Sequence, residues 1–480
     1  MNTRVRILDV THVQPEQTTY QPRDDAATIK LSPFDTFFLS FPPIQRLFLY
    51  DDGVDGTTLP PFPSLVSQLR ASLATTLAVF TLLAGKLTAC SHDDVVIDCS
   101  PGAVHPGVRF VEAEYCGDAA DMRRLARDVE HDSEAFLQLV PALELGLLPA
   151  PVLAVQVTRP APSGGDDSAG VGAVAVGVSM HHAVADGQSL WQFMSAWAAA
   201  SRDGSPAVAL GLVPPPTFNR APILQHPKAE AAAREFALLS APELPKVNML
   251  PETDLTRQSR RTYLLTAGQI QSLKRRILES QAAVNKNDDS EPPEPPTTYL
   301  AIASLLWTSI ARAKSVEHAN AADDAYFLFP ADCRRRLRPP LDPGFFGNCI
   351  KVCYARATVG DLVHGRNEND ALAGAAAAVR RAIREHVEEE DPLGDLDRWA
   401  ETNRTAPRER LAKQGSSHRF MAYEVDFGWG QPRRVELVSV FTEQMATLVG
   451  ARDGAVQVSM ALGREHMDAF EASFLSQVSA

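Results

Sequence analysis

The sequence contains few cysteines for its length. Six occur among 480 residues, and no two of them form a Cys-x-x-C pair. Sparse cysteines without paired spacing are typical of free thiols in a reducing compartment, and they argue against a disulfide framework or a cysteine-ligated metal. We therefore expect these cysteines to be core or loop residues, and we expect no metal site.

The sequence also lacks a long hydrophobic run and an excess of positive charge. No stretch of about eighteen apolar residues occurs, and residues 1–17 lack the apolar segment of a signal peptide. The formal net charge is −13, whereas nucleic acids and anionic membrane surfaces attract basic proteins. These absences predict a cytoplasmic protein that binds neither nucleic acid nor membranes.

The most informative segment is an apolar strand pattern that ends in two histidines. Residues 171–180 alternate between two faces, and neither face carries a charge. A strand of this kind is buried on both sides. Apolar residues at helical spacing follow over 189–197, so Asp186 lies at a strand-to-helix turn. The pattern predicts a strand, a turn and a helix, with His182 held at the end of the strand.

His182 and Asp186 have the spacing His-x-x-x-Asp. Imidazole has an ordinary pKa of ~6.5, so a neutral histidine can accept a proton from an alcohol or amine near pH 7. Two roles are open for Asp186: direct chemistry, or pairing with an arginine to fix the turn, because a buried carboxylate needs a partner. We favour the structural role. The spacing alone is common by chance, and His181 points to the opposite face, which argues against a metal site here.

A second motif lies near the end of the chain, within residues 423–432. Gly428 and Gly430 bracket Trp429 there. Glycine permits backbone conformations that are closed to other residues, and tryptophan supplies a large apolar surface. We expect a rigid, packed loop, and we interpret Asp426 as a structural residue of this loop rather than a catalytic one.

Together these two motifs, HHAVADG and DFGWG, resemble those of the plant BAHD acyltransferases. That family moves an acyl group from a coenzyme A thioester to an alcohol or amine. Two further segments are similar to the branch that acylates sugars of anthocyanins, flavonoids and other phenolic glucosides. The segments that carry the wider resemblance are 3–15, 69–87, 297–315 and 330–349, and those similar to the glucoside branch are 31–50 and 330–349.

The resemblance implies roles for individual residues. It makes His182 the general base and Asp186 a structural partner of Arg334. It places the DFGWG loop away from the reacting atoms, where the loop supports the architecture of the site. Basic clusters at 273–276 and 334–338 are open to two interpretations, solvated faces or phosphate contacts, and the resemblance makes Lys274 the candidate contact to a coenzyme A phosphate.

The expected fold is α/β, because segments with strand and helix patterns alternate in both halves and the length exceeds one ordinary core. The resemblance implies two similar chloramphenicol-acetyltransferase-like domains, each with a mixed sheet and flanking helices, and an active-site channel between them. We predict an N-terminal domain over 1–200 that carries HHAVADG, a crossover linker over 201–240, and a C-terminal domain over 241–480 that carries DFGWG.

The expected function is acyl transfer from coenzyme A to a hydroxyl of a phenolic or flavonoid glycoside. Malonyl is favoured as the acyl group, with hydroxycinnamoyl second, and a lysine or arginine near the acyl end would support malonyl because its free carboxylate needs a charged partner. No Gly-x-Ser-x-Gly motif occurs, which favours direct transfer in a ternary complex. We expect acyl-CoA to be a co-substrate and no cofactor to be permanently bound. We also expect the protein to be a monomer.

Three alternatives stay open. A BAHD transferase could use another alcohol or amine acceptor. A non-catalytic protein that binds acyl-CoA or phenolic glucosides would share the fold without needing His182. A peptide-synthetase condensation domain has a similar HHxxxDG core, but this chain carries no attached carrier domain and does have the DFGWG loop.

Overall fold

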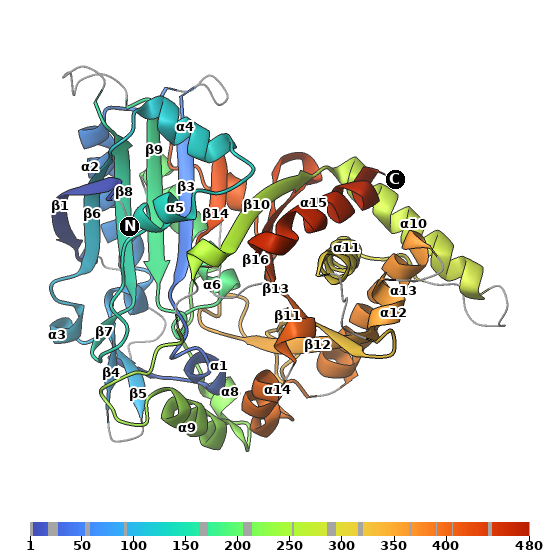
Figure 1. Ribbon diagram of the computed structural model, residues 1–480. Helices are drawn as coiled ribbons and strands as arrows, with labels where there is room; N and C mark the ends of the chain where they lie inside the picture. Colours follow the sequence, from blue (N-terminus) through green and yellow to red (C-terminus); the bar gives the residue numbers. More distant parts are fainter. Residues whose placement is uncertain are drawn as a thin grey trace. The chain divides into compact units, whose positions relative to one another are not determined.

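The computed structural model describes most of the chain. The chain divides into two compact units (Figure 1). Unit 1 comprises Met1–Glu252, Arg338–Cys349 and Met421–Phe441, and unit 2 comprises Thr253–Leu337, Ile350–Phe420 and Thr442–Ala480. The described residues are 3–17, 27–52, 58–90, 94–162, 171–204, 214–251, 254–285, 294–314, 320–363, 367–389, 391–405, 407–439 and 444–479.

Unit 1 is built on a six-stranded mixed sheet. The strands, in spatial order, are β1 (Val5–Val13), β6 (Val108–Tyr115), β8 (Leu153–Pro160), β9 (Ala173–Met180), β3 (Ile44–Asp51) and β14 (Arg434–Leu437). Only β6 and β8 pair in parallel, and the other neighbours are antiparallel. The central strand β9 is buried at every residue, as its uncharged pattern predicts.

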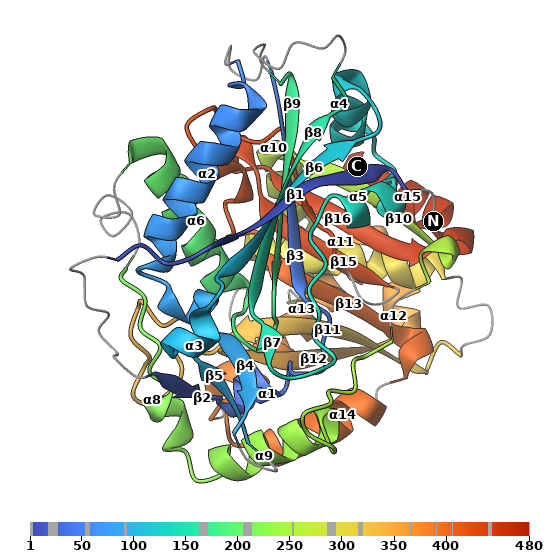
Figure 2. The same ribbon diagram turned by 90° about the vertical axis from the view of Figure 1, so that its left-hand side faces the viewer.

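Helices cover both faces of this sheet. On one face, Leu47 and Leu49 of β3 pack with apolar residues of α4 (Ala119–Arg127) and α5 (Ser133–Gln138). On the other face, Phe48 contacts Trp191 of α6 (Gly187–Asp203). Helix α2 (Phe62–Leu77) lies against α6, and Figure 2 shows the two side by side. This layering explains why β9 is buried on both sides.

The rest of unit 1 consists of a small sheet and short helices. The small sheet has the order β2 (Thr28–Lys30), β5 (Val95–Asp98), β4 (Lys86–Ala89) and β7 (Ala150–Pro151). The remaining helices are α1 (Pro33–Thr36), α3 (Pro101–Val104), α8 (Ala221–Leu224) and α9 (Ala229–Ser240). Helix α1 begins with a capping box, in which the side chains of Ser32 and Asp35 each accept from the other's backbone N–H.

Unit 2 has a second six-stranded mixed sheet. Its strands, in spatial order, are β10 (Gln258–Leu265), β16 (Val456–Gly463), β15 (Met445–Gly450), β13 (Leu411–Ser417), β11 (Asp324–Asp332) and β12 (Ile350–Thr358). Its helices are α10 (Ala267–Asn285), α11 (Thr298–Ala313), α12 (Val359–Val363), α13 (Glu368–Ile383), α14 (Trp399–Thr405) and α15 (Arg464–Ser479).

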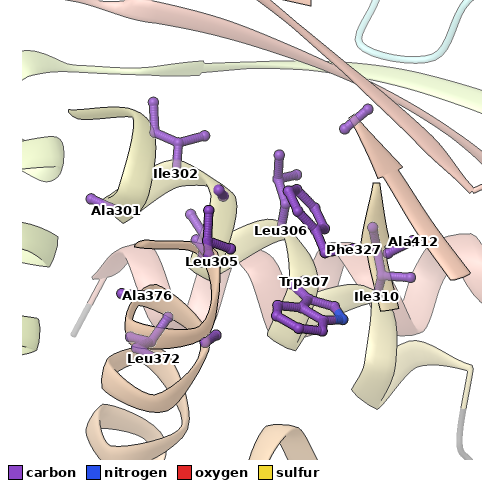
Figure 3. Packing of buried hydrophobic residues seen from close by; sticks show 14 of the residues in the cluster. Ala301, Ile302, Leu305, Leu306, Trp307, Ile310, Phe327, Leu372, Ala376 and Ala412 are labelled. Carbon is purple, nitrogen blue, oxygen red and sulfur yellow. The ribbon is translucent and has the colours of Figure 1, made fainter. Parts of the chain in front are cut away.

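Helix α11 lies at the centre of the unit 2 core. It is apolar almost all round, and it contacts both α13 and α15. Figure 3 shows Leu306, Trp307 and Ile310 of this helix close to Phe327 of β11 and Ala412 of β13. Alternate residues of the strands complete the same cluster. Unit 2 is therefore one sheet with helices packed on a single cluster of inward-facing side chains.

The predicted α/β class, with a mixed sheet in each of two units, is confirmed. The residues that make up each compact unit differ from the predicted division, which placed a linker at 201–240. Unit 1 continues to Glu252 and includes residues 421–441, because Tyr50 donates a hydrogen bond to the carbonyl of Val425 (2.8 Å) and β14 pairs with β3. The DFGWG segment thus packs with unit 1. Within the predicted linker, residues 205–213 lie outside the described residues.

In the part of the chain that the structure describes, no helix combines the length and the apolar character needed to cross a membrane.

Candidate active site

The predicted base, His182, lies directly after β9, in the turn that leads to α6. The turn is closed by the N–H of Val184, which donates to the carbonyl of His181 (3.0 Å). The imidazole of His182 stacks on Phe38, with ring centroids 4.0 Å apart and ring planes 8° apart. The ring of Phe41 meets it edge-on, with 6.1 Å between the two ring centroids. The ring is therefore oriented by aromatic packing.

His181 occupies a different environment. It is fully buried, and its Nδ1 accepts a hydrogen bond from the N–H of Ala183 (3.1 Å). Among the described residues, no group of three or more His, Cys, Asp and Glu side chains lies close enough to hold a metal ion.

The backbone of His182 is held by an asparagine that is distant in sequence. Nδ2 of Asn348 donates to the carbonyl oxygen of His182 (2.9 Å). Asn348 is itself fully buried. Among the described residues, Nδ1 of His182 has no hydrogen-bond partner. The turn is thus fixed through its backbone and through Phe38.

Asp35 fixes Asn348. Its Oδ1 accepts from the backbone N–H and from Nδ2 of Asn348 (3.0 and 3.1 Å), and its Oδ2 accepts from the N–H and hydroxyl of Ser32 (3.0 and 2.7 Å). Nε of Arg220 approaches Oδ2 at 3.4 Å. All of these groups are buried, so hydrogen bonds and one cation take the place of the water that would otherwise surround the carboxylate.

Asp186 connects the same segment to the start of α6. Its Oδ1 accepts from the N–H of Ser189, which makes it the N-cap of α6, and its Oδ2 accepts from the N–H of Cys349 (both 3.0 Å). The Ser189 hydroxyl adds two bonds to Gly347, one donated and one accepted (2.9 Å each). Residues 347–349 are therefore tied to both ends of the turn that carries His182.

Burial determines the protonation of the two histidines. Burial lowers the pKa of His182 to about 4, although part of the residue remains exposed. The negative charge of Asp186 raises this pKa, and the positive charge of Arg46 lowers it further. Burial, with a smaller contribution from His182, lowers the pKa of His181 to about 3. Both imidazoles are neutral at pH 7, so His182 is able to accept a proton.

The DFGWG loop is closed by its own aspartate. Oδ1 of Asp426 accepts from the N–H groups of Gly428 (2.8 Å) and Gly430 (2.9 Å). Both glycines have positive φ, 109° and 94°, a region that other residues rarely adopt. The Asp426 carboxylate thus bonds to the backbone of its own loop.

Side chains of α2, α6 and β3 hold this loop in unit 1. Gln68 and Ser201 both donate to the carbonyl of Phe427 (2.8 and 2.9 Å). The ring of Trp429 packs at 6.1 Å from Tyr50 and 5.6 Å from Phe427. The loop therefore braces the two helices that cover one face of the sheet.

Two predicted residues belong to unit 2. Arg334 follows β11, and its Nη1 lies 3.2 Å from Oδ1 of Asp332; its pairing with Asp186 of unit 1 stays a prediction.

Lys274 lies on α10, where its charge and that of Arg419 add to the effect of burial in lowering the pKa of His418. Two cations, Lys274 and Arg419, thus lie near His418, which follows the end of β13. Arg276 belongs to the same basic cluster as Lys274, and its Nε donates a hydrogen bond to Oδ1 of Asn369 (2.8 Å).

Comparison with known proteins decides the family. A family model described as the Transferase family matches residues 4–476. The chain belongs to this family, the BAHD acyltransferases. It is accordingly an acyl-CoA-dependent O-acyltransferase.

Several relatives of this BAHD acyltransferase match over nearly their full length. Phenolic glucoside malonyltransferase 1 of Bemisia tabaci is 28% identical over 100% of this chain and 98% of its own. Malonyl-CoA:anthocyanidin 5-O-glucoside-6''-O-malonyltransferase of Arabidopsis thaliana is 28% identical over 98% of both chains. Shikimate O-hydroxycinnamoyltransferase of Nicotiana tabacum is 28% identical over 84% of this chain and 86% of its own.

Solved structures with the same fold include vinorine synthase and a fungal protein. Vinorine synthase has a TM-score of 0.70 at 19% identity and covers 98% of both chains. The F. graminearum TRI101 structure with coenzyme A and T-2 mycotoxin has a TM-score of 0.64 at 15% identity, over 93% of this chain and 97% of its own. These likenesses confirm the fold of the BAHD acyltransferase.

Four residues at the site were not assigned a role from the sequence: Asp35, Asn348, Arg220 and Phe38. Asp35 has a local signal, because Ser32 and Asp35 form a capping box at the start of α1. Asn348 lies 313 residues from Asp35 and 166 residues from His182, and no local pattern connects them.

We predict that Asp35→Asn lowers the free energy of unfolding by about 3–5 kcal/mol, because it places an amide donor against N–H donors and leaves Arg220 buried without its carboxylate. Urea unfolding measures the change. Asp9→Asn is the matched control, since Asp9 lies exposed on β1 and should change stability by less than about 0.5 kcal/mol. Equal, small effects of both substitutions would show that the Asp35 network contributes little.

Proposed function

We propose that this BAHD acyltransferase moves an acyl group from a coenzyme A thioester to a hydroxyl of a phenolic or flavonoid glycoside, with malonyl favoured and hydroxycinnamoyl second. His182 is the general base. The observation that carries this proposal is the neutral imidazole of His182 at the end of a buried strand, stacked on Phe38 and held through Asn348. This is the arrangement that a base aligned with an acceptor hydroxyl requires.

The proposed reaction is a direct transfer. His182 takes the proton of the acceptor hydroxyl while the oxygen attacks the thioester carbonyl. The tetrahedral intermediate then collapses, the carbon–sulfur bond breaks, and the protonated His182 returns its proton to the departing thiolate. Proton transfer by a positioned side chain contributes roughly 10²–10⁴-fold to the rate.

The lowered pKa has two opposing effects on this step. With a pKa of about 4, His182 is almost entirely neutral at pH 7, so nearly every molecule holds the base form. The same shift makes the imidazole a weaker base. The charge of Asp186 raises the pKa of His182 and so stabilises the imidazolium that forms during transfer. Asp186 thereby supports the base while its oxygens remain bound to Ser189 and Cys349.

The remaining predicted residues have supporting roles in this proposal. Arg334 pairs with Asp186, and Asp426, Gly428, Trp429 and Gly430 keep the loop that braces α2 and α6. Lys274 contacts a phosphate of coenzyme A. The neighbouring charges of Lys274 and Arg419, which both act on His418, support that last assignment, because two cations favour a phosphate more than one does.

The relatives support the proposed substrates. Several relatives, at 24–28% identity, are named as malonyltransferases of phenolic glucosides or of anthocyanin and anthocyanidin glucosides. A second candidate, transfer to a different alcohol, is supported by the shikimate O-hydroxycinnamoyltransferase of Nicotiana tabacum at 28% identity. Both candidates use the same base and differ in the acceptor.

The test is release of free coenzyme A by the purified protein, with malonyl-, acetyl- and p-coumaroyl-CoA each offered against phenolic glucosides, flavonoid glucosides and shikimate. We predict acceptor-dependent release that is greatest with malonyl-CoA and a glucoside, and a loss of roughly 10²–10⁴-fold in His182→Ala. Full activity of His182→Ala would remove the base assignment. Failure of every pair with the wild-type protein would favour a binding protein instead.

We also predict the pH dependence of the reaction. Because the folded pKa of His182 is depressed to about 4, the active neutral form is present above that value and is lost as the pH falls through it. The kcat/KM for the acceptor, at saturating acyl-CoA, should stay constant from pH 7 to about 5 and decline below about 4. Circular dichroism at each pH checks that the protein remains folded. A decline centred near 6.5 would contradict the buried, neutral base.

A further inference from the structure

Arg46 is a buried cation in the unit 1 sheet, near the start of a strand that has neighbours on both sides. It lies on β3, where it pairs with Val178 of β9 and with Leu437 of β14. Only 7% of its surface is exposed. Residues 47–50, which follow it on the strand, are apolar and buried. A charged side chain at such a position is rare unless an opposite charge or a ligand meets it.

No carboxylate meets this guanidinium among the described residues. Nη1 donates to the carbonyl of Gln45 (2.9 Å), and the buried Nε has no hydrogen-bond partner in the described part of the chain. Burial lowers the pKa of Arg46 to about 9, a value at which the group is still protonated at pH 7. The side chain therefore holds a positive charge and an unused donor in the interior.

A neighbouring arginine shows the contrasting arrangement. Arg434 on β14 is 5% exposed, and its Nε donates to Oε1 of Glu436 at 2.6 Å. The same sheet thus contains one buried arginine with a carboxylate partner and one without. Among the described residues, the charge of Arg46 is therefore open to an anion from outside the chain.

Arg46 lies near the proposed base. Its charge is among those that lower the pKa of His182, and its cross-strand partner Val178 is four residues before His182 on β9. An anion bound by Arg46 must therefore have its negative charge close to the reacting carbonyl. In a malonyl thioester one methylene separates the carboxylate from the reacting carbonyl, so the two carbons are about 2.5 Å apart. A cation for this carboxylate must therefore lie close to the base.

We propose that Arg46 binds the free carboxylate of the malonyl group and so selects an anionic short-chain acyl donor. The inference rests on the proposed function and assigns its donor specificity to one side chain. The planar guanidinium matches a carboxylate with charge-assisted hydrogen bonds. An acetyl or hydroxycinnamoyl group brings no counter-ion, so its binding would leave the buried charge unpaired.

The test compares Arg46→Gln and Arg46→Lys with the wild-type protein, with malonyl-CoA and acetyl-CoA as donors and one glucoside as acceptor. Arg46→Gln should lower kcat/KM for malonyl-CoA by about 10- to 100-fold, the size typical of a charge-assisted contact, and should change the value for acetyl-CoA by less than about threefold. Arg46→Lys should recover part of the preference for malonyl-CoA, because it restores the charge without the planar geometry.

Arg434→Gln is the matched control. It removes a buried arginine from the same sheet and should lower stability, while the ratio of kcat/KM between the two donors stays at the wild-type value. Equal losses for both donors in Arg46→Gln, or a wild-type preference for acetyl- or p-coumaroyl-CoA, would overturn the assignment.

A binding measurement separates this inference from the proposed function. Calorimetric titration of the wild-type protein and of both Arg46 variants with malonyl-CoA and acetyl-CoA requires no turnover. Tighter binding of malonyl-CoA that is lost in Arg46→Gln and partly kept in Arg46→Lys supports the carboxylate site even if no acceptor reacts. Equal affinity of the wild-type protein for both donors overturns it. If Arg46→Gln does not fold, Arg46→Lys and the wild-type affinities decide the question.

Discussion

The hydrogen bonds that Asp35 accepts from Asn348 are the interaction on which the arrangement around His182 depends. Asp35 holds both the backbone and the side-chain amide of Asn348, and Asn348 then holds the carbonyl of His182. Asp186 fixes the adjoining residue Cys349 and the first turn of α6. Two buried carboxylates thus set the position of a neutral base through hydrogen bonds to backbone and amide groups around it.

The fold makes this arrangement stable because it pairs polar groups within an apolar interior. A buried carboxylate is tolerated only when donors surround it, and Asp35 has donors from Ser32, Asn348 and Arg220. The same lack of water that makes these bonds strong also lowers the pKa of His182. Rigidity of the turn and neutrality of the imidazole therefore have one physical cause.

Local sequence patterns were sufficient to predict the strand, turn and helix around His182, because period-2 and helical spacing are properties of neighbouring residues. They were also sufficient for the glycines of the DFGWG loop. The contacts of Asn348 with Asp35 and His182 join residues far apart in the chain, and no spacing rule specifies them. Packing of residues 421–441 into unit 1 was missed for the same reason. Arg46 did carry a local signal, because it directly precedes a run of apolar residues on a strand, although only its burial without a carboxylate partner among the described residues gave that signal a meaning.

The central claim is that the turn after β9 holds His182 as a neutral, rigidly placed imidazole. The most direct measurement is an NMR titration of the protein with ¹⁵N-labelled histidine, in which the His182 ring signals are assigned by comparison with the His182→Ala variant. We expect these signals to remain those of a neutral imidazole at pH 7 and to titrate near pH 4, at the depressed pKa. A titration near the ordinary value of ~6.5 would contradict the account, because it would mean that the ring is solvated and not held in the buried turn.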